Sequence, residues 1–227
     1  MHHQTKGIVL SRIKYAESSI ICKIYTSEFG TQSYMINGVR KKKGNSGYYQ
    51  VLNQLDLTVY NKNGKDLHRI KEVKMSKVYS SIPFDIYKSS IALFIAETLS
   101  KCLKEEVSNI DLYAFLEDAL IELDESDFDS QFHIKFLVSL SQYLGIYPNL
   151  ERHDLKYFDL LNGQFTNSKE HHLHYRENTN DIYLAFNQKR VKNKRETLNI
   201  ILEYYSLHIE GFKTIKSKEI LEKVLST

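Results

Sequence analysis

A change of hydrophobic period near residue 80 constrains the fold of this chain more than any other feature. Residues 6–79 alternate apolar and polar side chains with a period of two, as in 51–60, where Leu55, Leu57 and Val59 share one face. Five such runs are separated by short turns rich in Gly, Asn and Asp, which is the pattern of antiparallel strands. Beyond residue 80 the apolar residues recur at helical spacing. The pattern predicts an α+β protein in which strands precede helices.

Five strands without an intervening long helix fit a five-stranded OB-fold barrel over residues 1–80. The last two strands are joined across Asn63-Gly64, a strong signal for a β-hairpin. An SH3-like barrel or another five-stranded sheet fits the strand count equally well, so the pattern alone leaves these alternatives open.

Residues 81–227 are predicted to form an all-helical C-terminal domain. Helical spacing marks five segments, at about 82–103, 111–125, 130–146, 194–211 and 217–226. A polar, turn-rich stretch at about 148–188 interrupts them, and we interpret it as a small irregular hairpin insertion.

Charge is distributed unevenly along the chain. Residues 1–79 hold fourteen Lys and Arg against five Asp and Glu, whereas residues 80–170 hold seven against sixteen. The basic front and the acidic middle indicate two parts with different partners, and a basic front favours a polyanion.

The sharpest basic feature is the run Arg40–Lys43, which lies between Gly38 and Gly44 and precedes Tyr48 and Tyr49. Two flanking glycines disfavour a helix, so these cations are expected on a loop, where a polyanion relieves their mutual repulsion. The tyrosine rings could stack on unpaired bases. A merely solvated loop, with the tyrosines in the core, is the alternative.

A second basic cluster immediately precedes the helix predicted at 194–211. Cations are unfavourable near a helix N-terminus, and this local misfit favours contact with an external anion such as DNA. Ordinary surface charge is the alternative. The cluster consists of Lys189, Arg190, Lys192, Lys194 and Arg195.

No pattern of catalytic chemistry is present in the sequence. It has no P-loop, nucleophile elbow, HExxH motif or clustered acidic triad, so we expect neither an enzyme nor a cofactor. His171, His172 and His174 do not have the spacing of a zinc pair. Cys22 and Cys102 lie in apolar runs, which favours buried side chains over a disulfide. No apolar run is long enough for a membrane span, so a cytoplasmic protein without a membrane partner is expected.

The segment 6–43, "KGIVLSRIKYAESSIICKIYTSEFGTQSYMINGVRKKK", resembles the N-terminal domain of the bacterial recombination mediators of the RecO family. The shared features are the "GIVL" strand, the "YAES" turn, the "YTSEFG" turn and the strand that leads into "NGVRKKK". The continuation "VLNQLDLTVYNKNGKDLHRIKEVK" is also similar, so the resemblance spans about the first 80 residues.

The resemblance implies a non-catalytic protein of RecF-pathway repair. Such a protein binds single-stranded and double-stranded DNA, anneals complementary strands and, with RecR, helps load RecA onto DNA coated by single-strand-binding protein (SSB). RecA is then an indirect partner, and the helical domain receives the acidic C-terminal tail of SSB. Association with the nucleoid follows from DNA binding. DNA-binding residues implied in the barrel are the basic run Arg40, Lys41, Lys42 and Lys43, with Arg12, Lys14 and Lys23.

Many members of the family hold zinc on four cysteines in the insertion, but this chain has no cysteine there. The resemblance therefore implies a hairpin without metal, held instead by packing of Tyr157, Phe158, Leu161, Phe165 and Tyr183. An OB-fold RNA-binding module, such as a ribosome or translation factor, is the main alternative function, because phosphate contact and stacking serve either polymer. A metal-dependent nuclease is the weakest alternative.

Overall fold

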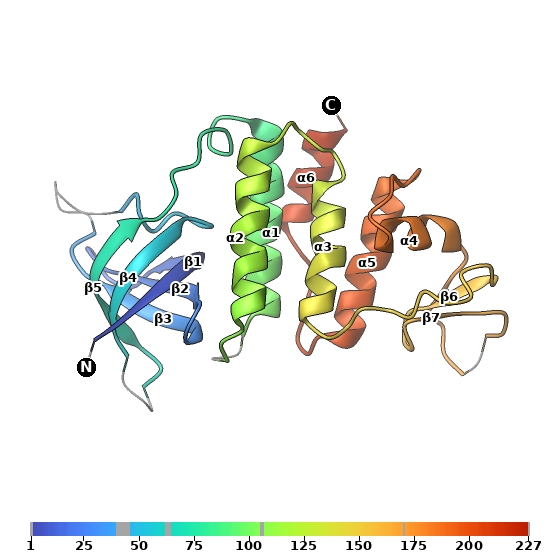
Figure 1. Cartoon of the computed structure of the whole chain (residues 1–227), viewed down its shortest axis with the longest axis horizontal. Coiled ribbons are helices and arrows are strands. Elements are labelled where there is room, and N and C mark those ends of the chain that lie inside the picture. The colour runs from blue at the N-terminus through green and yellow to red at the C-terminus, as the bar shows by residue number, and fades with distance from the viewer. Residues whose placement is uncertain (1, 40–45, 62–64, 105–106, 170, 227) are drawn as a thin grey trace. The chain divides into compact units, whose positions relative to one another are not determined.

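The structure is a computed structural model that describes residues 2–39, 46–61, 65–104, 107–169 and 171–226. The chain forms two compact units (Figure 1). The first unit comprises residues 1–128 together with 215–227, and the second comprises residues 129–214. In the first unit the final helix of the sequence therefore joins the helices that directly follow the barrel.

Residues 3–75 form a closed five-stranded barrel, which confirms the predicted OB-type architecture. The strands are β1 (His3–Lys14), β2 (Ile20–Thr26), β3 (Gly30–Ile36), β4 (Gln54–Tyr60) and β5 (His68–Met75). Their order around the barrel is β1-β2-β3-β5-β4. All neighbouring strands are antiparallel except β3 and β5, which pair in parallel over two residue pairs.

The barrel interior is filled by the alternating residues that the sequence pattern indicated. Leu55, Leu57 and Val59 are buried beside Ile24 and Tyr34. Close approach of the strands explains Gly7 in β1, because a Cβ there would lie 2.6 Å from Ile24 Cγ2. A side chain at this position would therefore push β1 away from β2.

Three helices complete the first unit: α1 (Ile86–Cys102), α2 (Ile110–Glu125) and α6 (Ser217–Leu225). The barrel meets α2 where the Tyr25 and Tyr113 rings stack at 6.2 Å and Tyr25 Oη donates to Asn109 O. Thr31 Oγ1 also donates to Leu103 O over 2.7 Å. One face of the β2–β3 pair is therefore partly covered by helices.

A buried carboxylate holds the segment between β5 and α1. Asp124, near the end of α2, accepts hydrogen bonds from the backbone N–H groups of Ser80, Ser81 and Ile82 at 2.8–2.9 Å. Burial raises the pKa of Asp124, but these hydrogen bonds outweigh burial and bring the pKa to about 2. The segment is therefore fixed to α2 by an ionised side chain.

Lys88 forms the second part of this anchor. Its ammonium is buried and donates to Ser81 Oγ, Asp124 O and Ser126 O at 2.7–2.9 Å. All three N–H groups are thus used, and two of them satisfy carbonyls at the C-terminal end of α2, where a cation is favourable.

Glu97 of α1 caps α6 in a similar way. Its carboxylate accepts from Lys216 N, Ser217 N and Ser217 Oγ at 2.7–3.0 Å. Burial raises the pKa of Glu97, but the hydrogen bonds from Ser217 and Lys216 outweigh burial and bring the pKa to about 2. An acidic side chain from one helix therefore fixes the N-terminus of another.

The Glu97→Gln substitution is expected to lower the free energy of unfolding by about 1–2 kcal/mol at pH 7, because it weakens three charge-assisted hydrogen bonds. The folded-state pKa lies below the ordinary value, so this stabilisation is present above about pH 4.5 and is lost as the pH falls towards 2. Urea unfolding from pH 6 to pH 3 should show the variant and the wild type converging. Glu122→Gln, at an exposed position of α2, is the matched control.

The second unit combines three helices with a small sheet. Its helices are α3 (Phe132–Tyr143), α4 (Thr179–Phe186) and α5 (Lys194–His208). Strands β6 (Tyr157–Asp159), β7 (Gln164–Thr166) and β8 (Tyr175–Arg176) form the sheet in the order β7-β6-β8. The predicted insertion thus contains a sheet and also α4, a helix that the sequence pattern did not indicate.

Aromatic packing holds this sheet, as predicted for a hairpin without cysteines. The Phe158 and Phe165 rings lie 5.0 Å apart and both side chains are buried. The prediction that Leu161 packs here is wrong, since Leu161 is exposed and its neighbour Leu160 is buried. The reason is local: Leu160 N donates to His174 O, which turns the Leu160 side chain inward.

Within the described residues, no helix is long and apolar enough to cross a membrane.

Candidate nucleic-acid interface

The outer face of the barrel carries a row of outward-facing side chains that crosses all five strands. Strand register pairs Ile13 with Ile21, Ile21 with Met35, Met35 with Arg69, and Arg69 with Tyr60. Directly opposed residues project from the same face of a sheet. We call this set the barrel row: Ile13, Ile21, Met35, Arg69 and Tyr60.

The barrel row is partly open to solvent, since Ile13, Arg69 and Tyr60 are exposed whereas Ile21 and Met35 are half-buried. Ile13 is 61% exposed and Tyr60 is 38% exposed. A hollow of about 580 Å³ lies at the β3–β5 end of the row, lined by Met35, Tyr60, Lys65, Leu67, His68 and Arg69. Apolar and aromatic surface in an exposed hollow suits the faces of unstacked bases.

Cations flank the barrel row. Lys23 projects from the same outer face, because its register partners are Ser11 and Ser33 rather than core residues. Lys65 and Arg69 border the hollow. Among the residues described in the structure, Lys23, Lys65 and Arg69 form no ion pair, so their charges are available to an external anion.

The loops at either end of the barrel row complete this face. Residues 15–19 connect β1 to β2 and carry the exposed Tyr15, while Lys65 and Leu67 lie just before β5 in the connection from β4. OB-folds bind oligonucleotides on the β2–β3 face between these two connections. The barrel row therefore occupies the position at which this architecture holds a ligand.

The other predicted cations of β1 lie elsewhere on the barrel. Arg12 pairs with Cys22 and Lys14 pairs with Ile20, and both partners project toward the barrel interior. Arg12 and Lys14 are nevertheless exposed, at the C-terminal end of β1. The structure thus separates these two side chains from Lys23, which lies on the opposite face of the sheet.

The predicted basic run Arg40, Lys41, Lys42 and Lys43 lies outside the described residues. The residues that lead into it do have defined positions: Asn37, Gly38 and Val39 line a groove of about 670 Å³ between β3 and β5. Lys71 and Lys74 line the same groove. The groove exists because the parallel pairing of β3 and β5 stops after Met35 and Arg69.

The prediction that Tyr49 stacks on bases is corrected by the structure. Tyr49 is 3% exposed and belongs to the hydrophobic core of the barrel. Tyr48 packs against the same core and is half-buried. Asn53 Nδ2 donates to Gly47 O and Tyr48 O and thereby holds this turn over the barrel end. The ring of Tyr60 is the better exposed one.

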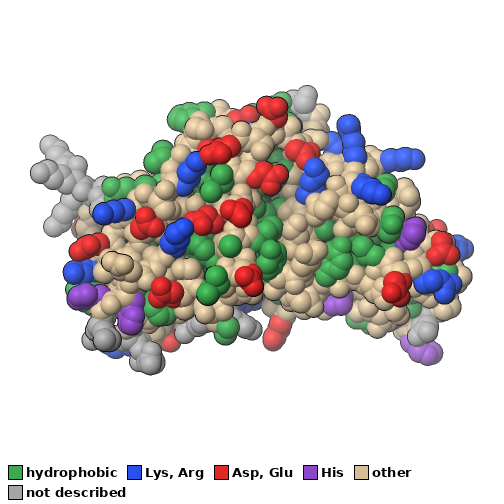
Figure 2. Space-filling model, in the orientation of Figure 1, with side chains coloured by type: hydrophobic (Ala, Val, Ile, Leu, Met, Phe, Trp, Pro, Cys, Tyr) green, Lys and Arg blue, Asp and Glu red, His purple; other side chains and the backbone are tan. Residues whose placement is uncertain are grey.

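The second basic cluster lies on the second unit, between α4 and the start of α5. Figure 2 shows Lys and Arg side chains gathered over this part of the surface. Lys194 Nζ donates to Ser130 Oγ, whereas the side chains of Lys189, Arg190, Lys192 and Arg195 are exposed. We call this set the α5 cluster: Lys189, Arg190, Lys192, Lys194 and Arg195.

An internal carboxylate partly compensates the helix start beneath the α5 cluster. Asp181 is buried and accepts from Lys192 N at 3.2 Å and Asn193 N at 2.8 Å. Asn193 then caps α5, because its Oδ1 accepts from Glu196 N over 3.1 Å. The side chains of Lys189, Arg190, Lys192 and Arg195 remain exposed to solvent above this helix start.

The histidines of the insertion have structural contacts. The His172 ring stacks on Tyr175 at 4.4 Å, and its Nε2 lies 3.4 Å from Asp159 Oδ1. His174 Nδ1 lies 3.5 Å from Glu203 Oε1. The part of the chain that the structure describes holds no group of three or more His, Cys, Asp or Glu arranged to bind a metal.

Sequence reasoning missed most of the barrel row. Alternation alone identifies Ile21, Met35 and Tyr60 as outward-facing, but it does not reveal that they share a line with Arg69. That line depends on the register of four strand pairs, which no short motif encodes. The one available signal was apolar residues at outward positions of strands, which is unusual for a solvated face.

Comparisons with known proteins cover the whole chain. A family model described as "Recombination protein O N terminal" matches residues 1–79, and one described as "Recombination protein O C terminal" matches residues 83–219. The chain is 35% identical over 237 residues to the DNA repair protein RecO of Flavobacterium johnsoniae, with 100% of both chains covered. It is 36% identical over 242 residues to that of Bacteroides fragilis, with 99% of both covered. It is 30% identical over 237 residues to that of Porphyromonas gingivalis, with 96% of both covered.

Proposed function

Because this chain belongs to the RecO family of DNA repair and recombination proteins, we propose that it is a DNA-binding mediator of RecF-pathway repair. It binds single-stranded and double-stranded DNA, anneals complementary strands and, with RecR, helps load RecA onto SSB-coated DNA. We assign it no catalytic step and expect it in the cytoplasm, at the nucleoid. The RNA-binding alternative does not account for the match over residues 83–219.

The barrel row is the observation that carries the proposal. An OB-fold whose outer face carries the exposed Ile13 and Tyr60 and the half-buried Ile21 and Met35, beside cations that form no ion pair with described residues, has the composition of a single-strand binding face. Bases contact Met35 and Tyr60, while Lys23, Lys65 and Arg69 contact phosphates. The basic run Arg40–Lys43 adds phosphate contacts at the adjoining β3 end.

The α5 cluster provides a second cationic surface on a different compact unit. Two separate surfaces of this kind would let one molecule hold two nucleic-acid strands at once. Strand annealing requires such simultaneous binding, and phosphate contact without base readout suits it because it tolerates any sequence.

The acidic tail of SSB requires a pocket with a cationic rim, for which the sequence of the helical domain offers Lys88, Lys101, Lys104, Lys135 and Arg152. Lys88 does not contribute to this rim, because its ammonium is buried and donates three internal hydrogen bonds. Lys101 is paired with Glu97 at 3.0 Å and Lys135 with Asp129 at 2.7 Å. These ion pairs would have to exchange partners for the tail to bind.

Two charge-reversal variants on β5, one in the barrel row and one outside it, test the barrel face. Arg69→Glu should weaken binding of a fluorescent oligothymidine by about tenfold or more at 100 mM salt, since it places a negative charge in the barrel row. Lys74→Glu is the matched control, because Lys74 faces Asp56 across the β4–β5 pair and lies outside the row. Equal loss of affinity in both variants would indicate unspecific electrostatics and would contradict the assignment of the row.

A pair of tyrosine substitutions separates stacking from packing. Tyr60→Ala is expected to lower affinity for oligothymidine about tenfold with a stability change near 0.5 kcal/mol. Tyr49→Ala removes a buried ring and is expected to lower the free energy of unfolding by about 3 kcal/mol. Fluorescence anisotropy and urea unfolding measure the two effects. A Tyr49→Ala variant that is stable but deficient in DNA binding would contradict the assignment of Tyr49 to the core.

A further inference from the structure

The first unit exposes large apolar side chains where α1 begins and α2 ends. Phe84 is 85% exposed and Ile86 is 63% exposed. The rings of Tyr87 and Phe128 pack against each other at 5.0 Å and are also partly open to solvent. We call these four residues, Phe84, Ile86, Tyr87 and Phe128, the apolar patch. Neither the barrel row nor the α5 cluster includes any of them.

The apolar patch is held rigidly from beneath. The Asp124 carboxylate binds three backbone N–H groups of the segment that precedes Phe84. Lys88 ties the first turn of α1 to carbonyls at the end of α2, and Asp85 caps α1 by accepting from Tyr87 N at 2.8 Å. Aromatic side chains on a fixed backbone lose little freedom when a partner binds, which is the property of binding hot spots.

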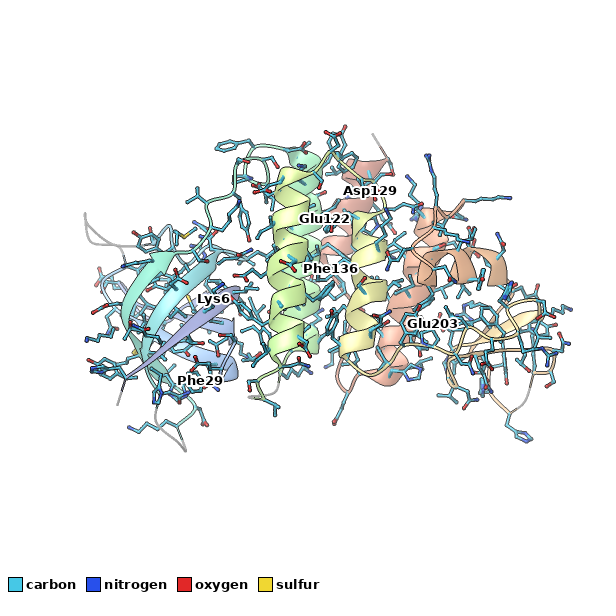
Figure 3. The ribbon with its side chains drawn as sticks, viewed as in Figure 1. Lys6, Phe29, Glu122, Asp129, Phe136 and Glu203 are labelled. Atoms are coloured by element: carbon cyan, nitrogen blue, oxygen red, sulfur yellow. The ribbon has the colours of Figure 1, made fainter. Side chains whose placement is uncertain are left out.

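Two exposed acidic residues lie near the patch residue Phe128 in the chain, Glu122 in the last turn of α2 and Asp127 directly before Phe128. Residues 80–128 contain eleven Asp and Glu against three Lys. Glu122 and Asp127 are exposed, and neither forms an ion pair within the described part of the chain. Figure 2 shows red side chains over α2, close to green ones at the upper edge of the molecule, and Figure 3 labels Glu122 on α2.

We propose that the apolar patch docks a partner protein through a segment in which apolar side chains lie next to Lys or Arg. The patch supplies the hydrophobic anchor points, and the unpaired carboxylates of Glu122 and Asp127 supply the charge complement. The negative charges of Glu122 and Asp127 repel DNA and acidic peptides. A second copy of the chain is disfavoured, because a two-fold contact would bring these charges against their own copies.

The test uses three fluorescent peptides of one length, about 16 residues, with wild-type full-length protein. The first is an amphipathic helix with Leu and Phe on one face and Lys on the other. The second carries Glu in place of Lys, and the third carries Ser in place of Leu and Phe. Anisotropy should show the first peptide binding at least about tenfold more tightly than either of the others.

Variants then locate the site. Phe84→Ser should weaken binding of the Lys peptide by about tenfold, and the double variant Glu122→Lys, Asp127→Lys should weaken it and reduce its salt dependence. Leu173→Ser is the matched control, since Leu173 is an exposed apolar residue of the second unit. Oligothymidine affinity should stay unchanged in Phe84→Ser and in Leu173→Ser.

Equal affinity for the Lys and Glu peptides would overturn the proposal, as would unchanged binding in Phe84→Ser. Sedimentation of the wild type and of Phe84→Ser tests whether a second copy of the chain occupies the apolar patch. A self-association that Phe84→Ser abolishes would assign the patch to a second copy and would also overturn the proposal. A monomer in both cases agrees with a heterologous partner.

Discussion

Replacing Asp124 by alanine is expected to lower the free energy of unfolding by about 4 kcal/mol. The substitution leaves the backbone N–H groups of Ser80, Ser81 and Ile82 without their acceptor in a buried place. It also removes the acceptor of the Ser80 hydroxyl, which donates to Asp124 Oδ2 over 3.1 Å. Few single substitutions outside the hydrophobic core should have a larger effect.

Urea unfolding followed by circular dichroism measures this loss. Asp118→Ala, at an exposed position on the same helix, should change stability by less than about 0.5 kcal/mol. Asp124→Asn should fall between the two, because an amide oxygen can accept some of the same bonds. A loss below about 1 kcal/mol for Asp124→Ala would mean that the segment between β5 and α1 does not depend on this carboxylate.

Replacing Arg40, Lys41, Lys42 and Lys43 together by alanine is expected to weaken single-stranded DNA binding about 100-fold at 100 mM salt. Each phosphate contact contributes roughly 0.7 to the slope of log affinity against log salt for a single strand, so the slope should flatten by about 3. Circular dichroism should be unchanged, since a run of four cations between two glycines is predicted to lie on a loop outside the alternating core positions.

The matched control replaces Lys6, Lys77, Lys101 and Lys218, which are four cations of the first unit outside the groove. All four already have acidic partners: Lys6 pairs with Glu117, Lys77 with Glu125, Lys101 with Glu97 and Lys218 with Glu222. Neutralising them should flatten the slope by less than about 1. An equal loss in the two quadruple variants would remove the basic run from the binding surface.

The sequence was sufficient for the barrel and for most of the helices. Leu55, Leu57 and Val59 alternate cleanly because one face of β4 is buried and the other is solvated. The helix α4 was missed because its eight residues are too few for a clear helical period, and a helix of this length depends on tertiary packing of Ile182 and Phe186.

The candidate site was less predictable than the fold. Charge runs such as Arg40–Lys43 are visible in any sequence, whereas the barrel row exists only once the strands are in register. Tyr49 illustrates the same limit of local patterns. A tyrosine beside a basic run is predicted to stack on bases, but the turn that carries Tyr49 buries its ring. A local sequence pattern shows which residue types are present, whereas the register of the strands determines which side chains lie next to each other.

The most direct test of a DNA-binding barrel face uses the methyl resonances of methionine. The chain has three methionines, and two of them separate the possibilities: Met35 lies in the barrel row, whereas Met75 packs against the barrel core. In protein labelled with carbon-13 methyl methionine, with assignments from Met35→Leu and Met75→Leu, oligothymidine should shift the Met35 signal saturably and leave that of Met75 in place. Saturable DNA binding that leaves the Met35 signal unmoved would contradict the account.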